Sequence, residues 1–359
     1  MKKLICGAIL ILISMSFTAC SKQSVELSQR EIVDAVSIDC DDSGYTVCAV
    51  AFRISADDKK NESYKFYKSK GETLSESFNQ LEQNTLSSLM FENNSVILLG
   101  KSVCEKKYSD TINYLFGNYK GAVQTEILGT ASSAEEFISS IASSGNSFTQ
   151  IIENFTSAVL KNAAISNPMY KCAPKKNGVV SMAFLPIVEA VEFEQPDAQK
   201  TKIIEVRLKG LSIFSNDRYL NTVNDELMTG IMLVQNRIEK IPIEIASGKR
   251  VFSAELQKPR LTVFKDTNKT NEYTVRCSLC ITTADSVSSL SEVERAAVKN
   301  EAAKYIRYLL TNAIQQTSSV YKIDILNLQW YRFLESDNVF KNISTKCPSK
   351  LQYEININF

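Results

Sequence analysis

Cys277 and Cys280 are separated by two residues, a spacing that zinc sites and dithiol redox centres share. Both cysteines lie in the alternating run Glu272–Thr283, which predicts a β-strand. Residues three apart on a strand point to opposite faces, so the two thiols would not meet without a bulge. We therefore predict that this pair packs within a sheet and binds no metal.

Asp39, Asp41 and Asp42 bring three carboxylates to a predicted turn before Gly44, and carboxylates are calcium ligands. The simpler interpretation is the solvated tip of a hairpin. The chain has no histidine, no P-loop, no dinucleotide-binding glycine motif and no nucleophile elbow. The sequence thus predicts no enzyme and no catalytic, cofactor or metal site, with a hydrolase based on Ser, Lys or carboxylates as a minor alternative.

Cys20 is the third candidate for chemistry, because it ends a segment with the features of a secretory signal. Lys2 and Lys3 precede an apolar run over residues 4–13, and small residues precede the cysteine in Ser16-Phe17-Thr18-Ala19-Cys20. Ten apolar residues span only about 15 Å as a helix, half of the ~30 Å hydrocarbon core. The segment resembles the lipobox of bacterial lipoproteins, in which a diacylglyceryl group alkylates the thiol before cleavage. We predict a signal peptide at 1–19 and lipid attachment at Cys20; the alternative is an incidental cysteine near an ordinary cleavage site.

The composition is that of a globular protein with no strong electrostatic field. Of 359 residues, 44% are hydrophobic and 23% are charged, and the length favours two or three domains. Lys and Arg number 41 against 40 Asp and Glu, so removal of the signal with its two lysines leaves a formal charge of −1. A nearly neutral chain is not steered towards nucleic acid, and no nucleic-acid partner is predicted.

The N-terminal half alternates predicted strands and helices. Thr73 and Glu76 form a capping box for a helix whose apolar face comprises Leu74, Phe78, Leu81, Thr85 and Leu89. The remaining predicted elements are strands at 32–39, 45–54, 64–68, 95–100, 122–129 and 178–190, and helices at 109–116 and from Ser133. Residues 139–177 are polar and small, and they predict a connecting region.

The C-terminal half has longer alternating strands and one long helix. Strands are predicted at 203–209, 211–214, 241–246, 250–256, 260–265 and 273–282, with another opening at 218. The helix begins at Ser291, whose capping-box partner is Glu294, and ends near 317. Its apolar stripe comprises Val293, Ala297, Ala302, Ile306, Leu309, Leu310, Ala313 and Ile314. Residues 351–359 alternate perfectly and predict a strand docked by its odd-numbered residues.

These patterns predict an α+β fold of several domains, with a C-terminal antiparallel sheet that packs on the long helix. The predicted divisions are a lipidated tether at 20–30, a mixed α/β region at 31–196 that could hold two subdomains, and an α+β domain at 197–359. The boundary is set by Glu194-Gln195-Pro196-Asp197. The single Trp330 is predicted to be a core residue, with a binding surface as the alternative.

Several segments follow one another in an order and spacing typical of one known family. After Cys20 these are REIVDAVSID at 30–39 with Gly44-Tyr45, GETLSESF at 71–78, NSVILLG at 94–100, LKGLSIF at 208–214 with Tyr219-Leu220 and Glu226-Leu227, the helix from Ser291 and the alternating tail at 353–359. Together they resemble the Ger(x)C lipoproteins, the C-type subunits of bacterial spore germinant receptors. Ser21-Lys22 follows the lipobox cysteine where that family has Trp-Asp, so the chain resembles a divergent member.

The resemblance implies a function as well as a fold. Proteins of this family are three-domain, mixed α/β lipoproteins on the outer face of the spore inner membrane. They assemble with two membrane-embedded partners, the A-type and B-type subunits, into a receptor for nutrients, and no enzymatic activity is attributed to them. Of the family's functional residues, the lipid-attachment cysteine carries over, to Cys20. The alternative is a generic lipid-anchored solute-binding or envelope-assembly lipoprotein.

Overall fold

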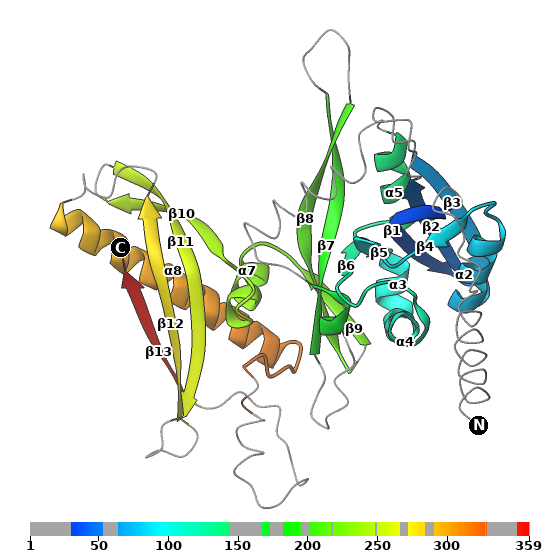
Figure 1. The fold of residues 1–359 in the computed structure, drawn as a ribbon. Coiled ribbons are helices and arrows are strands. Elements are labelled where there is room, and N and C mark those ends of the chain that lie inside the picture. The colour runs from blue at the N-terminus through cyan, green and yellow to red at the C-terminus, as the bar shows by residue number, and fades with distance from the viewer. Residues whose placement is uncertain are drawn as a thin grey trace, which may run out of the picture.

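The computed structural model contains two β-sheets with helices packed against them (Figure 1). It describes residues 30–52, 64–143, 167–172, 182–194, 202–216, 218–247, 250–265, 272–283, 291–326, 328 and 350–358. The predicted signal peptide, Cys20 and Trp330 lie outside the described residues.

The larger sheet has nine strands in the order β3-β2-β1-β5-β6-β7-β8-β9, and β4 pairs with the start of β1. The strands are β1 (Arg30–Asp41), β2 (Gly44–Phe52), β3 (Tyr64–Gly71), β4 (Ser88–Met90), β5 (Val96–Leu99), β6 (Glu126–Thr130), β7 (Met182–Glu194), β8 (Lys202–Ser215) and β9 (Arg218–Val223). Neighbouring strands from β1 through β5 and β6 to β7 are parallel, β4 is parallel to β1, and the outer pairs are antiparallel. Parallel strands in the middle of a sheet need helices on both faces, because both sets of side chains are apolar.

Helices cover both faces of the central strands. One face packs against α2 (Leu74–Gln83), α3 (Lys101–Lys106) and α4 (Tyr108–Asn118), and the opposite face packs against α5 (Ala134–Ser143). Ile97 and Leu98, neighbours in β5, are both 0% exposed and belong to the two different clusters. The predicted hairpin, the helix from Thr73, the strand at 95–100 and the helix from Ser133 are all present.

Four details of the N-terminal half differ from the prediction. Leu89 lies in the short strand β4 and not on the face of α2, which ends at Gln83. No sequence pattern indicated the six-residue α3, and β6 begins at Glu126, four residues later than expected. Part of the predicted connecting region is helical, since α5 runs to Ser143 and residues 169–172 form the 3-10 turn η2 (Met169–Cys172). Short elements such as α3 and β4 are set by tertiary contacts because they carry too few residues to show a period.

The hairpin of β7 and β8 spans the predicted boundary at 194–197. Pairing runs from Met182↔Ser215 to Glu194↔Lys202, so the residues after 201 continue the same sheet as those before 195. The far ends of β7 and β8 extend beyond the other strands as a two-stranded arm (Figure 1). The change from one sheet to the other comes after β9, at α7 (Asp225–Val234). The division into domains at 196/197 stays a prediction.

The smaller sheet has the order β10-β11-β12-β13. Its strands are β10 (Lys240–Ser247), β11 (Arg250–Lys265), β12 (Glu272–Thr283) and β13 (Lys350–Asn358). The prediction of an antiparallel sheet is correct for the first three strands and wrong for β13, which runs parallel to β12. The two strands predicted at 250–256 and 260–265 are one strand with a bulge between Gln257 and Arg260, where Pro259 cannot donate to the ladder and Lys258 has φ 49°.

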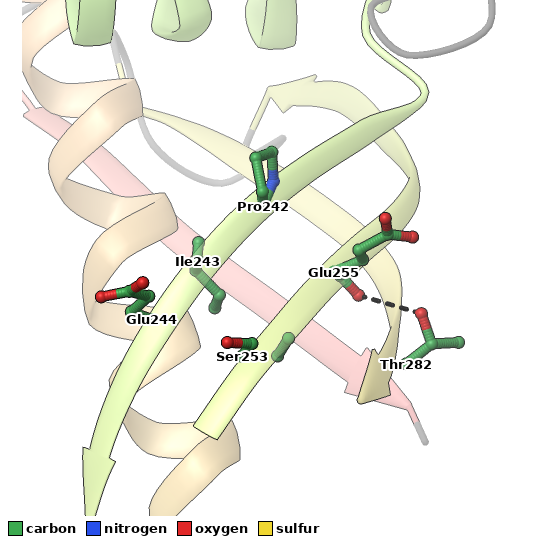
Figure 2. A pocket seen from close by; sticks show the side chains of 7 residues that line it. Pro242, Ile243, Glu244, Ser253, Glu255 and Thr282 are labelled. Atoms are coloured by element: carbon green, nitrogen blue, oxygen red, sulfur yellow. Dashed lines mark hydrogen bonds between the residues drawn. The ribbon is translucent and has the colours of Figure 1, made fainter. Parts of the chain in front are cut away.

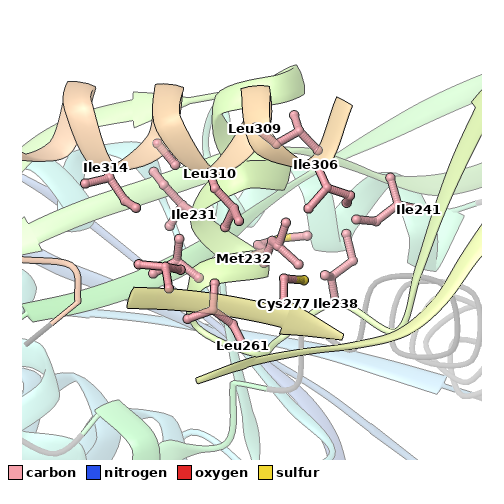
Figure 3. Close-up of a cluster of buried hydrophobic side chains, with 14 of the residues drawn as sticks. Ile231, Met232, Ile238, Ile241, Leu261, Cys277, Ile306, Leu309, Leu310 and Ile314 are labelled. Carbon is pink, nitrogen blue, oxygen red and sulfur yellow. The ribbon is translucent and has the colours of Figure 1, made fainter. Parts of the chain in front are cut away.

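One long helix, α8 (Glu292–Ser319), packs on one face of this sheet together with α7 (Figure 3). Ser291 and Glu294 form the predicted capping box. The apolar stripe begins one turn later than predicted, because Val293 is 80% exposed whereas Val298 is buried. The buried residues of the helix are Val298, Ala302, Ile306, Leu309, Leu310, Ala313, Ile314 and Thr317.

The crossing of α7 and α8 requires glycine at 230. A Cβ atom there would lie 2.5 Å from the carbonyl oxygen of Leu309 and 2.9 Å from the Cβ of Ala313. Helix α7 is therefore held close to α8, and Gly230 permits the short distance between the two backbones.

The last strand is docked as its alternation predicts. Leu351, Tyr353, Ile355 and Ile357 are half-buried against the core under α8, and the even-numbered residues between them are exposed. This confirms the prediction for the C-terminal strand, and the mixed architecture confirms the α+β fold class.

Candidate functional site

The two cysteines with metal-site spacing point to opposite faces of β12. Cys277 is 0% exposed and packs in the core under α8, while Cys280 is exposed on the other face. Burial raises the pKa of the Cys277 thiol to about 12, so the thiol stays protonated and unreactive at neutral pH. The predicted placement of the two thiols on opposite faces of a strand is confirmed.

The three aspartates have separate roles. Asp41 and Asp42 are exposed at the tip of the β1–β2 hairpin, where Asp41 Oδ1 accepts hydrogen bonds from the backbone and hydroxyl of Ser43 at 2.8 and 2.6 Å. Asp39 is not part of this tip, contrary to the prediction. Its carboxylate accepts hydrogen bonds from the backbone N–H groups of Ala134 and Glu135 at 3.1 and 2.7 Å.

Asp39 therefore caps the first turn of α5 from a strand 95 residues earlier. Ser133 Oγ also donates to it at 3.1 Å. A Cβ on Gly100 would lie 1.8 Å from Asp39 Oδ1, so the carboxylate occupies the space that this glycine leaves. A capping carboxylate satisfies N–H groups that have no partner within the helix and interacts favourably with the helix dipole. Its role here is structural.

An ion pair between a buried carboxylate and a half-exposed lysine at the start of β1 was not foreseen. The side chain of Glu31 is 1% exposed, and its carboxylate accepts hydrogen bonds from Lys65 Nζ at 2.6 Å and from the hydroxyl of Tyr67. Burial raises the pKa of Glu31, but these hydrogen bonds and the charge of Lys65 outweigh burial and hold the pKa below its ordinary value. An acid inside an apolar strand was the one sequence signal for this pair.

A cavity of about 240 Å³ lies between α3 and the β6–β9 side of the larger sheet. Its lining comes from α3, the end of β6, the middle of β7, strands β8 and β9, and the residue before α7: Lys101, Cys104, Glu105, Thr130, Ala131, Ile187, Lys209, Ser212, Tyr219, Thr222 and Asn224. Several of its polar groups pair with the protein itself. Ser212 Oγ lies 2.7 Å from Thr222 Oγ1, Lys209 pairs with Glu189, and Lys101 lies 3.8 Å from Glu105. The cavity has room for a small polar solute.

Two grooves flank β10, the edge strand of the smaller sheet. The groove of about 460 Å³ on the outer face is bordered by Pro242, Glu244, Ser253, Glu255 and Thr282 (Figure 2). The second groove, about 550 Å³, lies between β10 and α8. Edge strands that carry proline resist pairing with a further strand, because proline has no N–H to donate. A partner at either groove would therefore be bound by side chains and not by adding a strand to the sheet.

The fold and these surfaces define a class: an elongated, two-sheet α+β protein with a small cavity beside α3 and grooves along the edge strand β10. Within the described residues, no helix combines the length and hydropathy that crossing a bilayer requires. Nor do three or more of the Cys, Asp and Glu side chains described gather as a metal-ion site would require.

Two family models match the chain in order. Residues 23–190 match the model described as "Spore germination protein N-terminal domain", and residues 209–359 match "Spore germination B3/ GerAC like, C-terminal". Since the two matches together span most of the sequence, the chain belongs to the Ger(x)C family of spore germination proteins. The gap between the matched ranges falls in the β7–β8 hairpin.

A solved structure supports the fold. The structure titled "Crystal Structure of the GerBC protein" aligns with a TM-score of 0.53 at 12% sequence identity, over 90% of this chain and 96% of that one. At this identity the likeness shows a shared fold. No curated protein sequence matches the chain.

Proposed function

We propose that this protein is a lipid-anchored, non-enzymatic subunit of a spore germinant receptor and that nutrient-triggered germination requires it. Its place is the outer face of the spore inner membrane, where it assembles with membrane-embedded A-type and B-type subunits. The anchor is an acyl-modified Cys20. The observation that carries this proposal is the ordered match of both family models across residues 23–190 and 209–359.

The sequence around Cys20 supports the anchor. An apolar run too short to span a bilayer leads to small residues before the cysteine, as lipoprotein processing requires. Each CH₂ group that enters the bilayer contributes about 0.8 kcal/mol, and two or three acyl chains hold a protein stably where one does not. The non-enzymatic role is supported by the lack of histidine in the sequence and by the polar pairs that line the described cavity.

The receptor role is tested by deleting the gene in a spore-forming host that carries no second copy. We expect spores to form normally and to lose the response to at least one nutrient, measured as the fall in optical density after nutrient addition. The wild-type gene supplied in trans should restore that response. Unchanged germination with every nutrient would contradict the proposal.

The anchor is tested with a matched pair of cysteine variants. Cys20→Ser removes the predicted acyl acceptor, whereas Cys280→Ser removes an exposed thiol on β12 that has no predicted role. We expect the first variant to leave the membrane fraction and to fail in complementation, and the second to behave like the wild type. Mass spectrometry of the N-terminal peptide should show the acyl group in the wild type and in Cys280→Ser, and should not show it in Cys20→Ser.

A solute-binding lipoprotein is the second candidate, and the cavity of about 240 Å³ favours it. A ligand that binds only the folded state raises stability by RT ln(1 + [L]/Kd). Thermal unfolding of the full chain with a panel of small polar solutes distinguishes the two roles. A rise in Tm that Ser212→Leu abolishes would favour solute binding, and no rise with any solute favours the receptor-scaffold role.

A further inference from the structure

The parallel strands of the larger sheet begin at one edge, which we call the amino edge. It comprises the start of β1 at Arg30, the loop 84–87 before β4 and, five residues further along β1, the loops 91–95 and 119–125 that precede β5 and β6. Arg30 pairs with Ser88, so the first described residue of the chain lies beside the loop 84–87. The chain therefore enters the folded body at this edge.

Exposed apolar side chains gather at the amino edge. Across residues 30–52 and 64–143, the large apolar residues that are exposed are Leu86 at 109%, Val123 at 57%, Phe66 at 39% and Phe116 at 37%. Leu86 and Val123 lie in two of the amino-edge loops, Phe116 lies at the end of α4 that leads into 119–125, and Phe66 lies in the first half of β3. A single exposed leucine is ordinary, but exposed apolar side chains grouped on one surface mark a site for a protein or a membrane.

The two loops with exposed apolar tips are tied to each other. Lys120 Nζ lies 2.6 Å from Glu82 Oε1, and Thr85 Oγ1 donates to the carbonyl of Glu82 at 2.8 Å. Loop 119–125 is also fixed to the next loop, since Thr125 Oγ1 donates to the carbonyl of Asn94 at 2.9 Å. Leu86 and Val123 are therefore presented by one connected edge.

The opposite edge, at the carboxyl ends of the same strands, is charged. Lys70 and Asp41 lie 3.9 Å apart there, and Lys106 and Asp42 lie 4.0 Å apart. Both edges carry ion pairs, and they differ in that the exposed large apolar side chains of residues 30–52 and 64–143 lie at the amino edge, where the chain enters.

The length of chain before Arg30 limits where the bilayer can be. Ten residues, Cys20 to Gln29, separate the predicted acyl group from Arg30. A fully extended chain of ten residues spans at most about 35 Å. If Cys20 is acylated, the amino edge is held within that distance of the membrane, while the charged edge is further away by the length of β1.

We propose that the amino edge is a second membrane contact, in which Leu86 and Val123 enter the interfacial region of the bilayer. This inference rests on the proposed lipid attachment at Cys20. It orients the nine-stranded sheet with the starts of β1, β4, β5 and β6 towards the lipid and the cavity beside α3 away from it. The acyl chains supply the affinity, and the two loops fix the orientation.

The charges at this edge select the kind of lipid surface. Lys65 pairs with Glu31 and Lys120 pairs with Glu82, so these two cations are compensated by acids on neighbouring elements. Arg30, the other cation at this edge, is matched in number by the exposed Glu92 of loop 91–95, so the edge gains little from anionic lipid, unlike a polybasic segment. The contact should therefore form on electrically neutral phosphatidylcholine and should change little with salt.

The test places a tryptophan at the edge of the full-length, acylated protein bound to phosphatidylcholine vesicles. The variants are Leu86→Trp and Val123→Trp, each combined with Trp330→Phe so that one indole remains. Val293→Trp in the same background is the matched control, because Val293 is 80% exposed at the start of α8, on the other sheet. Brominated phosphatidylcholine quenches an indole that enters the bilayer, and circular dichroism checks the fold of each variant.

We expect quenching of the indole in Leu86→Trp and in Val123→Trp to exceed that in the Val293→Trp control at least three-fold. Emission should shift to shorter wavelength and should change little between low and high salt. Equal quenching at the edge and at the control position would overturn the inference. A second set that keeps Trp330 and subtracts its signal gives the same reading if Trp330→Phe unfolds the chain.

Flotation of the vesicles separates this inference from the proposed anchor. Vesicle-bound Leu86→Trp protein whose indole is not quenched overturns the edge contact alone. Protein that carries no acyl group and does not float overturns the anchor as well.

Discussion

The central strands of the nine-stranded sheet are covered by helices on both faces, whereas the four-stranded sheet has α8 on one face and an open face on which most side chains are polar. In β5, Ile97 and Leu98 are both buried; in β11, Leu261 is buried and its neighbour Thr262 is exposed. The first kind of sheet needs continuous apolar sequence and the second needs alternation. The difference teaches that burial on one face or two, and not strand propensity, decides which substitutions the two sheets tolerate.

The largest effect should come from truncating adjacent residues in the two sheets. Ile97→Ala and Leu98→Ala should each cost about 2–5 kcal/mol of unfolding free energy, because each leaves a cavity in a different core. Leu261→Ala should cost a similar amount, whereas Thr262→Ala should stay within about 0.5 kcal/mol. Urea unfolding followed by circular dichroism measures all four. If one of the two β5 variants is as mild as Thr262→Ala, that face of the larger sheet is not covered.

The second test concerns the docked edge of the smaller sheet. Ile357→Lys places a charge on the half-buried face of β13 and should cost about 1–3 kcal/mol, since the ammonium loses water or the strand lifts from the core. Asn356→Lys is the control, because residue 356 points away from the core. Equal tolerance of the two substitutions in thermal unfolding would mean that β13 does not dock by its odd-numbered residues.

The third test concerns the N-cap of α8, the helix that covers the buried face of the smaller sheet. Ser291→Ala removes the side chain that accepts from the backbone N–H of Glu294, and it should cost about 1 kcal/mol. Ser319→Ala at the other end of α8 is the control, because its hydroxyl donates to the carbonyl of Gln315 in an exposed turn. A loss for Ser319→Ala as large as that for Ser291→Ala would argue against a specific capping role.

The smallest effect compares an ion pair whose carboxylate is buried with an ion pair whose carboxylate is exposed. The pKa of Glu31 is below its ordinary value, so its contribution to stability is present above the ordinary glutamate pKa of about 4.3 and is lost as the pH falls through the lower folded value. Glu31→Gln should therefore flatten the decline in Tm below about pH 5. Glu354→Gln, which breaks the exposed pair with Arg276 on β12, should leave the pH profile unchanged. Parallel profiles for wild type and Glu31→Gln would exclude a role for the buried carboxylate.

Much of the local structure follows from the sequence because neighbouring residues decide it. The Ser291 and Glu294 pair started α8 where predicted, the alternation at 351–359 placed β13, and the strand pattern at 272–283 put Cys277 and Cys280 on opposite faces. Each of these depends on hydrogen bonds or periods within a few residues. The family resemblance was available for the same reason, since its motifs are short runs within single elements.

The tertiary structure alone decided the contacts between distant segments. It made β13 parallel to β12, set Asp39 under α5 from 95 residues away, joined β7 to β8 across the predicted boundary, and left Leu86 exposed beside the start of β1. No local pattern specifies these pairings, because an alternating strand docks equally well in either direction and a carboxylate caps whichever helix start comes within reach. The sequence determined which elements form and which faces are apolar; the packing of the two cores determined which elements meet and which edge stays uncovered.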